Sequence, residues 1–292
     1  MIDQPYPISL STLEIWRRHH GTTLDEARKR FMQFVVLESI SASSVWRGRL
    51  AFKGGNALRF VYHNHRSTAD LDFTAEGSFP DDGAQIRTTL DGAMIFATNR
   101  FGVKARTQRV RRNPPGADKT YATYQISIGY QLPEDRHFAD FETWDRPLVT
   151  VVVLEISLND VVCNTQQVAL GDDASIKIRV CTLEDILAEK LRALLQQVVR
   201  KRTRKQDLFD IARMIGIHGD EIDRDKVAAY FERKCRGRDI EPRRELFNED
   251  VRRQARIEYD SLFADMDPDY FIAFEEAWLA LQQFLSELPL HH

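Results

Sequence analysis

The chain has 292 residues, of which 43% are hydrophobic and 29% charged. This length suits one large or two ordinary domains, and the composition excludes a disordered, fibrous or disulfide-stapled protein. The formal net charge is only −3, but basic residues gather in a few blocks, so local charge patches say more about partners than the total does.

The cysteines and the N-terminus indicate a cytoplasmic protein. Cys163, Cys181 and Cys235 are odd in number and lack the short paired spacings of structural zinc sites, so we interpret them as reduced thiols. Residues 1–10 lack the pattern of a signal peptide, and no stretch reaches the roughly 18 apolar residues of a membrane span. We expect no membrane partner, and we interpret His291-His292 as the remnant of an expression tag.

The first two-thirds of the chain carries a mixed α and β pattern. Residues 23–39 place apolar side chains at helical spacing behind Thr23, a possible cap. The pattern then predicts, in chain order, a short helix over 56–62, a strand over 70–73, a helix over 79–99 and strands over 121–132 and 148–158.

The pattern becomes helical from Thr182 to the end of the chain. Thr182-Leu183-Glu184-Asp185 resembles a capping box, and apolar residues follow it at helical spacing. We therefore expect a domain boundary near residue 180, with one domain over 1–180 and a helical domain over 181–292.

Asp70 and Asp72 form the strongest candidate metal site. In an extended segment their side chains point to the same face, while Leu71 and Phe73 point into the core. Two adjacent carboxylates without a cation raise each other's pKa, so the pair favours a divalent metal such as Mg²⁺. A solvated loop or an edge strand is the alternative for an isolated pair of this kind.

Gly54-Gly55 strengthens the interpretation of this pair. The two glycines follow an apolar stretch and precede a helical segment, so the backbone can approach a ligand and the helix N-terminus can bind phosphate oxygens. A tight turn with no ligand is the alternative. Taken together with the carboxylates, the glycines indicate a nucleotide triphosphate site.

Glu155 is the candidate third acid. It stands alone in the apolar run 151–156, where an ionisable group is costly unless it is paired or bound to a metal. It could bind the metal or take the proton of an attacking hydroxyl. The alternative is a glutamate at a strand end, paired with an arginine.

Two residues of the helical region complete the candidate catalytic set. Lys190 projects from the apolar side of its predicted helix, where its ammonium could either reach solvent or point into a cleft toward a phosphate. Asp207 lies at the margin of the next apolar face. Asp210 is expected to point outward, as a partner for Arg213 or Arg204.

These residues together resemble the AbiEii/AbiGii family of nucleotidyltransferase toxins, the toxin half of type IV toxin–antitoxin systems. The resemblance spans roughly residues 20 to 215 and is carried by Phe52-Lys53-Gly54-Gly55-Asn56-Ala57-Leu58-Arg59, Tyr62-His63-Asn64-His65-Arg66-Ser67, Asp70-Leu71-Asp72-Phe73 and the segments 183–194 and 204–211.

The resemblance implies an α/β fold, with a mixed-sheet nucleotidyltransferase-like core and a mainly helical C-terminal domain that completes the active-site cleft. It implies an NTP substrate, Mg²⁺ or Mn²⁺, a cognate antitoxin and, as the leading acceptor, the 3′ end of tRNA. The family motif maps onto Gly54, Gly55, Asp70, Asp72, Lys190 and Asp207.

Nucleotide binding is assigned to Lys53, Gly54, Gly55, Asn56, Arg66 and Lys190. Asn56 departs from the family, which usually has Ser or Thr after the glycines. Its amide can still donate to a phosphate oxygen, but it lacks the hydroxyl.

Two basic blocks are candidates for binding RNA phosphates, with ordinary solvated surface as the alternative for each. Neither block is interleaved with aromatic residues, so base stacking is not indicated. The residues concerned are Arg109, Arg111 and Arg112 in the first block and Arg200, Lys201, Arg202 and Arg204 in the second.

The leading hypothesis is therefore a metal-dependent transferase of nucleoside monophosphates, with Asp70, Asp72 and Glu155 at the metal. The alternatives are a catalytically silent protein that binds RNA or a partner, and an enzyme that nucleotidylates a protein. His63 and His65 flank Asn64 without the wide spacing of a nuclease motif, so we expect them to line the cleft or cap a helix.

Overall fold

The computed structural model describes residues 4–64, 66, 68–80, 82–115, 121–201, 203–266 and 268–290. The chain forms two compact units. The first comprises Met1–His63, Thr68–Asp160 and Gln166–Val180, and the second comprises Asn64–Ser67, Val161–Thr165 and Cys181–His292. The expectations for His65, Arg202 and the terminal His291-His292 lie outside the described residues.

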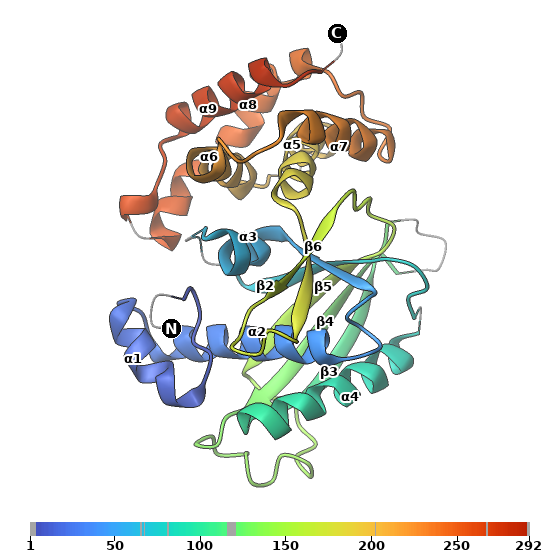
Figure 1. The fold of residues 1–292 in the computed structure, drawn as a ribbon, viewed down its shortest axis with the longest axis vertical. Helices are drawn as coiled ribbons and strands as arrows, with labels where there is room; N and C mark the ends of the chain where they lie inside the picture. Colours follow the sequence, from blue (N-terminus) through green and yellow to red (C-terminus); the bar gives the residue numbers. More distant parts are fainter. Residues whose placement is uncertain are drawn as a thin grey trace. The chain divides into compact units, whose positions relative to one another are not determined.

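The first unit is built on a mixed sheet with the strand order β3-β4-β5-β2-β1-β7-β6 (Figure 1). β2 pairs with β1 in the antiparallel and with β5 in the parallel sense, while β4 is antiparallel to both of its neighbours. The strands are β1 Leu50–Lys53, β2 Asp70–Ala75, β3 Lys104–Asn113, β4 Thr123–Gln131, β5 Val151–Ser157, β6 Thr165–Ala169 and β7 Lys177–Cys181.

Two helices pack side by side over one face of this sheet, with α2 against β5 and α4 against β3 (Figure 1). Every second side chain of the central strands points toward them and is buried, Leu71 and Phe73 among them, which is why these segments alternate in sequence. The helices of this unit are α1 Leu13–His19, preceded by the 3-10 turn η1 Leu10–Thr12, α2 Leu24–Ala42, α3 Gly54–Tyr62 and α4 Gly83–Phe101.

Local signals account for the ends of these helices. The Thr23 hydroxyl accepts the Glu26 N–H at 3.2 Å and begins α2, as the sequence predicts. The carboxylate of Asp82 accepts the first N–H groups of α4, which therefore begins at Gly83 and not near residue 79. His63 ends α3 in the left-handed conformation, with φ 57°, and so caps that helix.

The second unit is mainly helical. α5 packs against α6, α7 and α8, and α6 packs against α9. The Thr182 hydroxyl accepts the Asp185 N–H at 3.4 Å, which confirms the predicted start of α5. The helices are α5 Leu183–Arg200, α6 Gln206–His218, α7 Arg224–Arg236, α8 Glu249–Arg256 and α9 Phe274–Glu287, with the 3-10 turns η2 Arg244–Leu246, η3 Tyr259–Asp265 and η4 Pro268–Tyr270.

The expected fold class, a mixed α/β core followed by a mainly helical part, is thereby confirmed. In the portion of the chain that the structure describes, no helix combines the length and the apolarity needed to cross a bilayer. Cys163, Cys181 and Cys235 are all described, and they form no disulfide bond.

Glu38 on α2 is a buried carboxyl group that forms no ion pair with any residue that the structure describes. Its side chain is 2% exposed, and Oε2 has no hydrogen-bond partner among the described residues. A Cβ added to Gly171 would lie 3.4 Å from that oxygen, so the backbone at Gly171 packs closely on it. Burial raises the pKa of Glu38 to about 7; Arg100 opposes the shift, and the charges of Asp173 and Asp172 add to it.

A Glu38→Gln substitution should therefore change how stability depends on pH. Because the pKa of Glu38 is higher in the folded protein than its ordinary value of 4.5, the wild type loses stability as pH rises from about 4.5 to about 7. The variant cannot ionise at this position. We expect it to gain on the order of 3 kcal/mol over the wild type between about pH 4.5 and about pH 7, measured by urea unfolding.

The exposed Glu142→Gln is the control, and its difference from the wild type should stay constant over this range. A Glu38→Gln difference that is also independent of pH would contradict the raised pKa.

Candidate active site

The register of the sheet places the candidate carboxylates in two rows on one face. Residues paired across neighbouring strands point to the same side. The first row runs through Lys53 on β1, Asp72 on β2, Glu155 on β5, Gln125 on β4 and Arg111 on β3. This is the face opposite to Leu71 and Phe73, as the alternation predicts.

The second row contains the other carboxylate of the pair. Asp70 on β2 is in register with Val153 on β5, which pairs with Ser127 on β4, and Ser127 pairs with Arg109 on β3. Asp70, Asp72 and Glu155 therefore share one face, although Glu155 is more than eighty residues away from the pair in sequence.

Gly54 allows the Asp72 carboxylate to lie against the N-terminus of α3. Gly54 has φ +74°, and a Cβ built there would lie 2.2 Å from Asp72 Oδ2, so no larger residue fits without moving the carboxylate. The sequence predicted that these glycines let the backbone approach a ligand. In the structure the group that comes close to Gly54 is the Asp72 side chain itself.

The electrostatics of the face favour a cation. Burial raises the pKa of Asp70, and the nearby charge of Glu155 raises it further, with Lys29 opposing. The two carboxyl groups are therefore close enough to repel each other, and a divalent ion would relieve that repulsion.

The carboxylates on this face are ligands of the kind that Mg²⁺ or Mn²⁺ takes from a protein. Among the described residues, no three Asp, Glu, His or Cys side chains form a ready-made metal group. Mg²⁺ commonly takes only one or two carboxylates and completes its shell with water and substrate phosphates. Asp70 and Asp72 meet that need, with Glu155 as the neighbour in register.

Glu155 lies within β5, and its Oε1 accepts the Gln125 amide at 3.2 Å. The alternative of a strand-end glutamate paired with an arginine is therefore wrong.

The structure corrects the role expected for Asn56. Its side chain is fully buried, and its Nδ2 donates to the carbonyl oxygens of Asp70 at 2.6 Å and Thr68 at 3.3 Å. Its Oδ1 accepts Arg30 Nη1 at 3.0 Å. Both amide hydrogens are thus used inside the protein, and in this arrangement neither can donate to a phosphate.

Lys53, the other nucleotide-binding candidate beside the glycines, is engaged in an ion pair. Its Nζ lies 2.8 Å from Asp160 Oδ2, and both side chains are largely buried. Lys53 is also in register with Asp72. Its ammonium group therefore lies at the β1 end of the row that contains Asp72 and Glu155.

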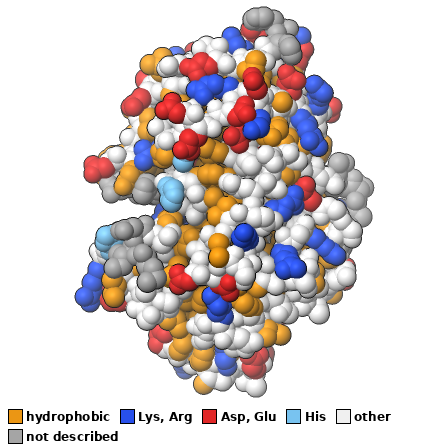
Figure 2. All heavy atoms as spheres, viewed as in Figure 1, with side chains coloured by type: hydrophobic (Ala, Val, Ile, Leu, Met, Phe, Trp, Pro, Cys, Tyr) orange, Lys and Arg blue, Asp and Glu red, His pale blue; other side chains and the backbone are white. Residues whose placement is uncertain are grey.

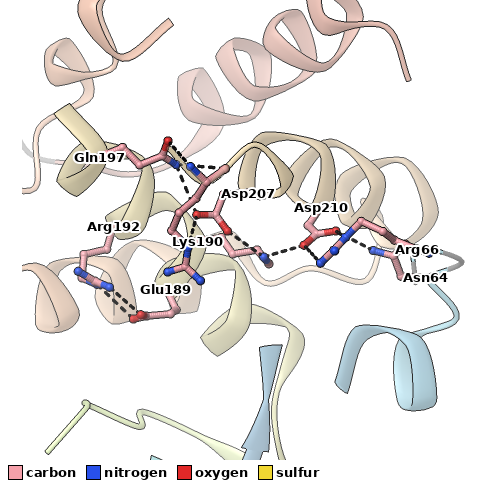
Figure 3. Close-up of polar contacts among 9 residues, drawn as sticks. Asn64, Arg66, Glu189, Lys190, Arg192, Gln197, Asp207 and Asp210 are labelled. Atoms are coloured by element: carbon pink, nitrogen blue, oxygen red, sulfur yellow. Dashed lines mark hydrogen bonds and ion pairs between the residues drawn. The ribbon is translucent and has the colours of Figure 1, made fainter. Parts of the chain in front are cut away.

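The second unit holds a buried charge cluster around Lys190 (Figure 3). Lys190 Nζ lies 3.1 Å from Asp207 Oδ1 and 2.8 Å from Asp210 Oδ2. Arg66 donates from Nε and Nη2 to the two oxygens of Asp210 at 2.9 and 3.0 Å, and the amide of Asn64 donates to Asp210 Oδ1 at 3.3 Å. The structure thus brings Lys190, Asp207 and Arg66 together, as candidates that sequence reasoning had named separately.

Asp210 is the residue of this cluster that sequence reasoning misplaced. It is completely buried and pairs with neither Arg213 nor Arg204, so the expected outward orientation is wrong. Burial alone would raise the pKa of Asp210, but the charges of Arg66 and Lys190 together hold it at about 2.

The expected orientation of Asp210 is wrong because α6 packs against both α5 and α9. The side of α6 that was expected to face water is therefore covered. One feature of the sequence could have indicated that Asp210 shares the side of Asp207. The two acids are one turn apart on a helix rich in apolar residues.

The structure separates the residues of the first basic block. Arg109 and Arg111 are exposed and lie in the two carboxylate rows. Arg112 is in register with Tyr124 on the face covered by the helices, with its guanidinium carbon 5.8 Å from the ring centroid. Arg112 therefore does not share the face of the carboxylates.

The second block follows the end of α5, where Arg200, Lys201 and Arg204 are exposed. Arg204 Nε also lies 3.4 Å from Asp207 Oδ2. On the face drawn in Figure 2, Lys and Arg side chains lie among Asp and Glu and do not form one continuous field. On this face, any polyanion site is therefore local.

In fold the chain is similar to MenT4, a nucleotidyltransferase toxin from Mycobacterium tuberculosis H37Rv, with a TM-score of 0.55 and 18% identity over 95% of this chain and 90% of that one. It is also similar to JHP933 from Helicobacter pylori, with a TM-score of 0.50 and 14% identity over 89% of each chain.

The family model described as nucleotidyl transferase AbiEii toxin, type IV TA system, matches residues 36–280, so the chain belongs to this family. The resemblance inferred from the motifs is thereby confirmed. A comparison with curated protein sequences gives no match.

Gly54→Ala should destabilise the protein more than an alanine at another glycine of similar backbone conformation. Gly77 has φ +69° and no atom within 4 Å of an added Cβ, so Gly77→Ala tests the backbone strain alone. We expect about 1 kcal/mol for Gly77→Ala and about 3 kcal/mol for Gly54→Ala, because Asp72 must also move.

Urea unfolding of the two variants measures the difference. Equal losses would show that the Asp72 carboxylate does not depend on the space at Gly54.

Proposed function

We propose that this member of the toxin family transfers a nucleoside monophosphate from an NTP to an acceptor hydroxyl, with Mg²⁺ or Mn²⁺ held by Asp70 and Asp72 and flanked by Glu155. The observation that carries the proposal is the register that sets Asp72 beside Glu155 and on the same face as Asp70. Membership in the AbiEii family supports the transferase class.

The transfer forms one bond and breaks one. The acceptor oxygen attacks the α-phosphorus, the bond from that phosphorus to the bridging oxygen of the β-phosphate breaks, and pyrophosphate leaves. Bound metal would neutralise charge on the phosphates during this step. The proton of the acceptor hydroxyl goes to a carboxylate, for which we propose Glu155.

Glu155 is preferred to Asp207 in this role because both oxygens of Asp207 already contact other side chains. One lies 3.1 Å from Lys190 Nζ and the other 3.4 Å from Arg204 Nε. Both oxygens of Asp207 are therefore already engaged within the protein, and neither is left to contact the acceptor hydroxyl.

We propose that the N–H groups of Gly54 and Gly55 at the start of α3 bind the phosphates, with Lys53 as the cationic partner in the same unit. In the second unit, Lys190 and Arg66 are the candidates for binding phosphate. A helix N-terminus favours anions, and Arg66 and Lys190 are held in fixed positions by a shared carboxylate, Asp210. The shared carboxylate fixes their geometry before a nucleotide arrives.

For the acceptor we propose RNA, with the 3′ end of tRNA as the first candidate. The support is that Arg109 and Arg111 are exposed and in register with the rows of Asp70 and Asp72. β3 is the third strand from β2, about 14 Å away at the usual strand spacing. The phosphates of an RNA end can reach both positions at once.

Arg200, Lys201 and Arg204 form a second candidate surface for the same acceptor. The family also implies a cognate antitoxin as partner, and we propose that the protein acts in the cytoplasm, where NTPs and tRNA are available. Asn56 stands where the family usually has Ser or Thr, but this difference does not favour a catalytically silent binding protein. The Asn56 amide donates to the backbone of β2.

Incubation with Mg²⁺, α-labelled NTPs and total cellular RNA should transfer label to RNA. Asp72→Asn keeps the size of the side chain but removes its charge, and we expect transfer to fall by about 100-fold or more. The exposed Asp145→Asn serves as the control and should retain wild-type transfer.

Label found in protein would replace RNA by a protein acceptor. No label in either, or label that does not depend on Asp72, would overturn the proposed function.

Arg109→Ala with Arg111→Ala should weaken the use of RNA without affecting the nucleotide. We expect KM for RNA to rise about 10-fold, with KM for the NTP unchanged. The slope of log KM for RNA against log salt concentration should fall by about two, because two phosphate contacts are lost. Arg47→Ala with Arg253→Ala removes the same charge from exposed positions elsewhere and is the matched control. Equal effects of the two pairs would exclude a specific role for β3.

A further inference from the structure

A fully buried polar network links α2 and α3 in the first unit. Arg30 and Gln33 on α2 and Asn56 on α3 are each 0% exposed. Arg30 is paired with Glu26 at 2.7 Å, and its Nη1 donates to Gln33 Oε1 at 2.9 Å and to Asn56 Oδ1 at 3.0 Å. The charge of Arg30 is thus compensated by Glu26, which lies one turn away on the same helix and is partly exposed.

The remaining N–H groups of these side chains donate to three successive backbone carbonyls. Thr68 O accepts Arg30 Nη1 at 3.1 Å, and Ala69 O accepts Gln33 Nε2 at 2.9 Å. Asp70 O accepts Asn56 Nδ2 at 2.6 Å. These three residues lead directly into β2, whose first residue is Asp70.

A buried arginine is costly, and burial together with the charge of Arg30 also lowers the pKa of Arg59 to about 9. Apolar side chains could fill the same space without that cost. Buried polar networks that are fully satisfied fix one geometry, which apolar packing does not do as strictly. What this network fixes is the backbone that carries the candidate carboxylates.

We propose that Asn56, Arg30 and Gln33 are positioning residues that hold the backbone of residues 68–70 and thereby set the places of the Asp70 and Asp72 carboxylates. The inference rests on the proposed function for its catalytic part. It gives Asn56 a role toward the protein's own strand, where the family resemblance suggested a contact with a phosphate.

The chemistry of the side chain explains why an amide stands at position 56. It donates twice, to Thr68 O and Asp70 O, and accepts once, from Arg30. A serine or threonine hydroxyl has a single hydrogen and could not make both donations. In this chain the residue after the glycines therefore fastens α3 to the start of β2.

Asn56→Asp is the sharpest test because it changes one donor group into an oxygen at constant size. The acceptor facing Arg30 is retained, while the new oxygen faces the carbonyls of Thr68 and Asp70 and repels them. Ser39→Ala is the matched control: Ser39 is also buried on α2, but its hydroxyl donates only to Val35 O of its own helix. Gln33→Met, which removes the bonds to the carbonyls of Thr68 and Ala69 together with one acceptor of Arg30, serves if Asn56→Asp does not fold.

Three measurements are made on the full chain: the rate of nucleotidyl transfer, Mn²⁺ binding by electron paramagnetic resonance, and hydrogen exchange of the peptide covering residues 68–75. We expect Asn56→Asp to lower kcat about 100-fold and to raise the Mn²⁺ concentration for half-saturation about 10-fold, with faster exchange in that peptide. Gln33→Met should move all three in the same direction by smaller factors, and Ser39→Ala should stay within about two-fold of the wild type.

The failures are distinguishable. Wild-type kcat, Mn²⁺ binding and exchange in both Asn56→Asp and Gln33→Met would overturn the positioning network while the proposed function stands. A wild type that transfers no nucleotide would overturn the proposed function, and the Mn²⁺ and exchange measurements would then decide the network alone. If the wild type also binds no Mn²⁺, the positioning of a metal site is overturned with it.

Discussion

The pairing of β2 with β1 on one side and β5 on the other is the constraint on which the candidate site depends. It sets Asp72 between Lys53 and Glu155 and fixes which face of the sheet the carboxylates share. A shift of one residue in this register would turn Asp70 and Asp72 into the core and bring Leu71 out. The buried alternate residues of β2 oppose such a shift, so the hydrophobic core determines the geometry of the polar face.

Both units stabilise buried charge by the same means, which is to share it among several partners. In the second unit one carboxylate, Asp210, contacts Lys190, Arg66 and Asn64. In the first unit Arg30 contacts Glu26 and the backbone at the start of β2 in the same way. In each case the polar atoms that would be costly alone are satisfied together, and the side chains that carry them lose their freedom to move.

The proposed chemistry uses rigid and exposed parts of one sheet for different tasks. The carboxylates lie on central strands, where backbone pairing on both sides holds them. Arg109 and Arg111 lie on the edge strand β3, where side chains reach solvent and can meet a partner of variable shape. This division matches what phosphoryl transfer requires, because the reaction depends on fixed positions at the phosphate and tolerates looser contacts along the acceptor.

The sequence by itself determined the features that depend on neighbours within one or two turns: the caps at Thr23 and Thr182 and the shared face of Asp70 and Asp72. It also predicted the short helix after the glycines, over 56–62, which in the structure begins two residues earlier, at Gly54. Its motifs also indicated the family. Only the tertiary structure decided that Asp210 is buried, that Asn56 bonds to the β2 backbone, and that the third acid and the basic edge strand stand in register with the carboxylates. Those outcomes depend on partners far away in the chain, which periodicity and local spacing do not specify.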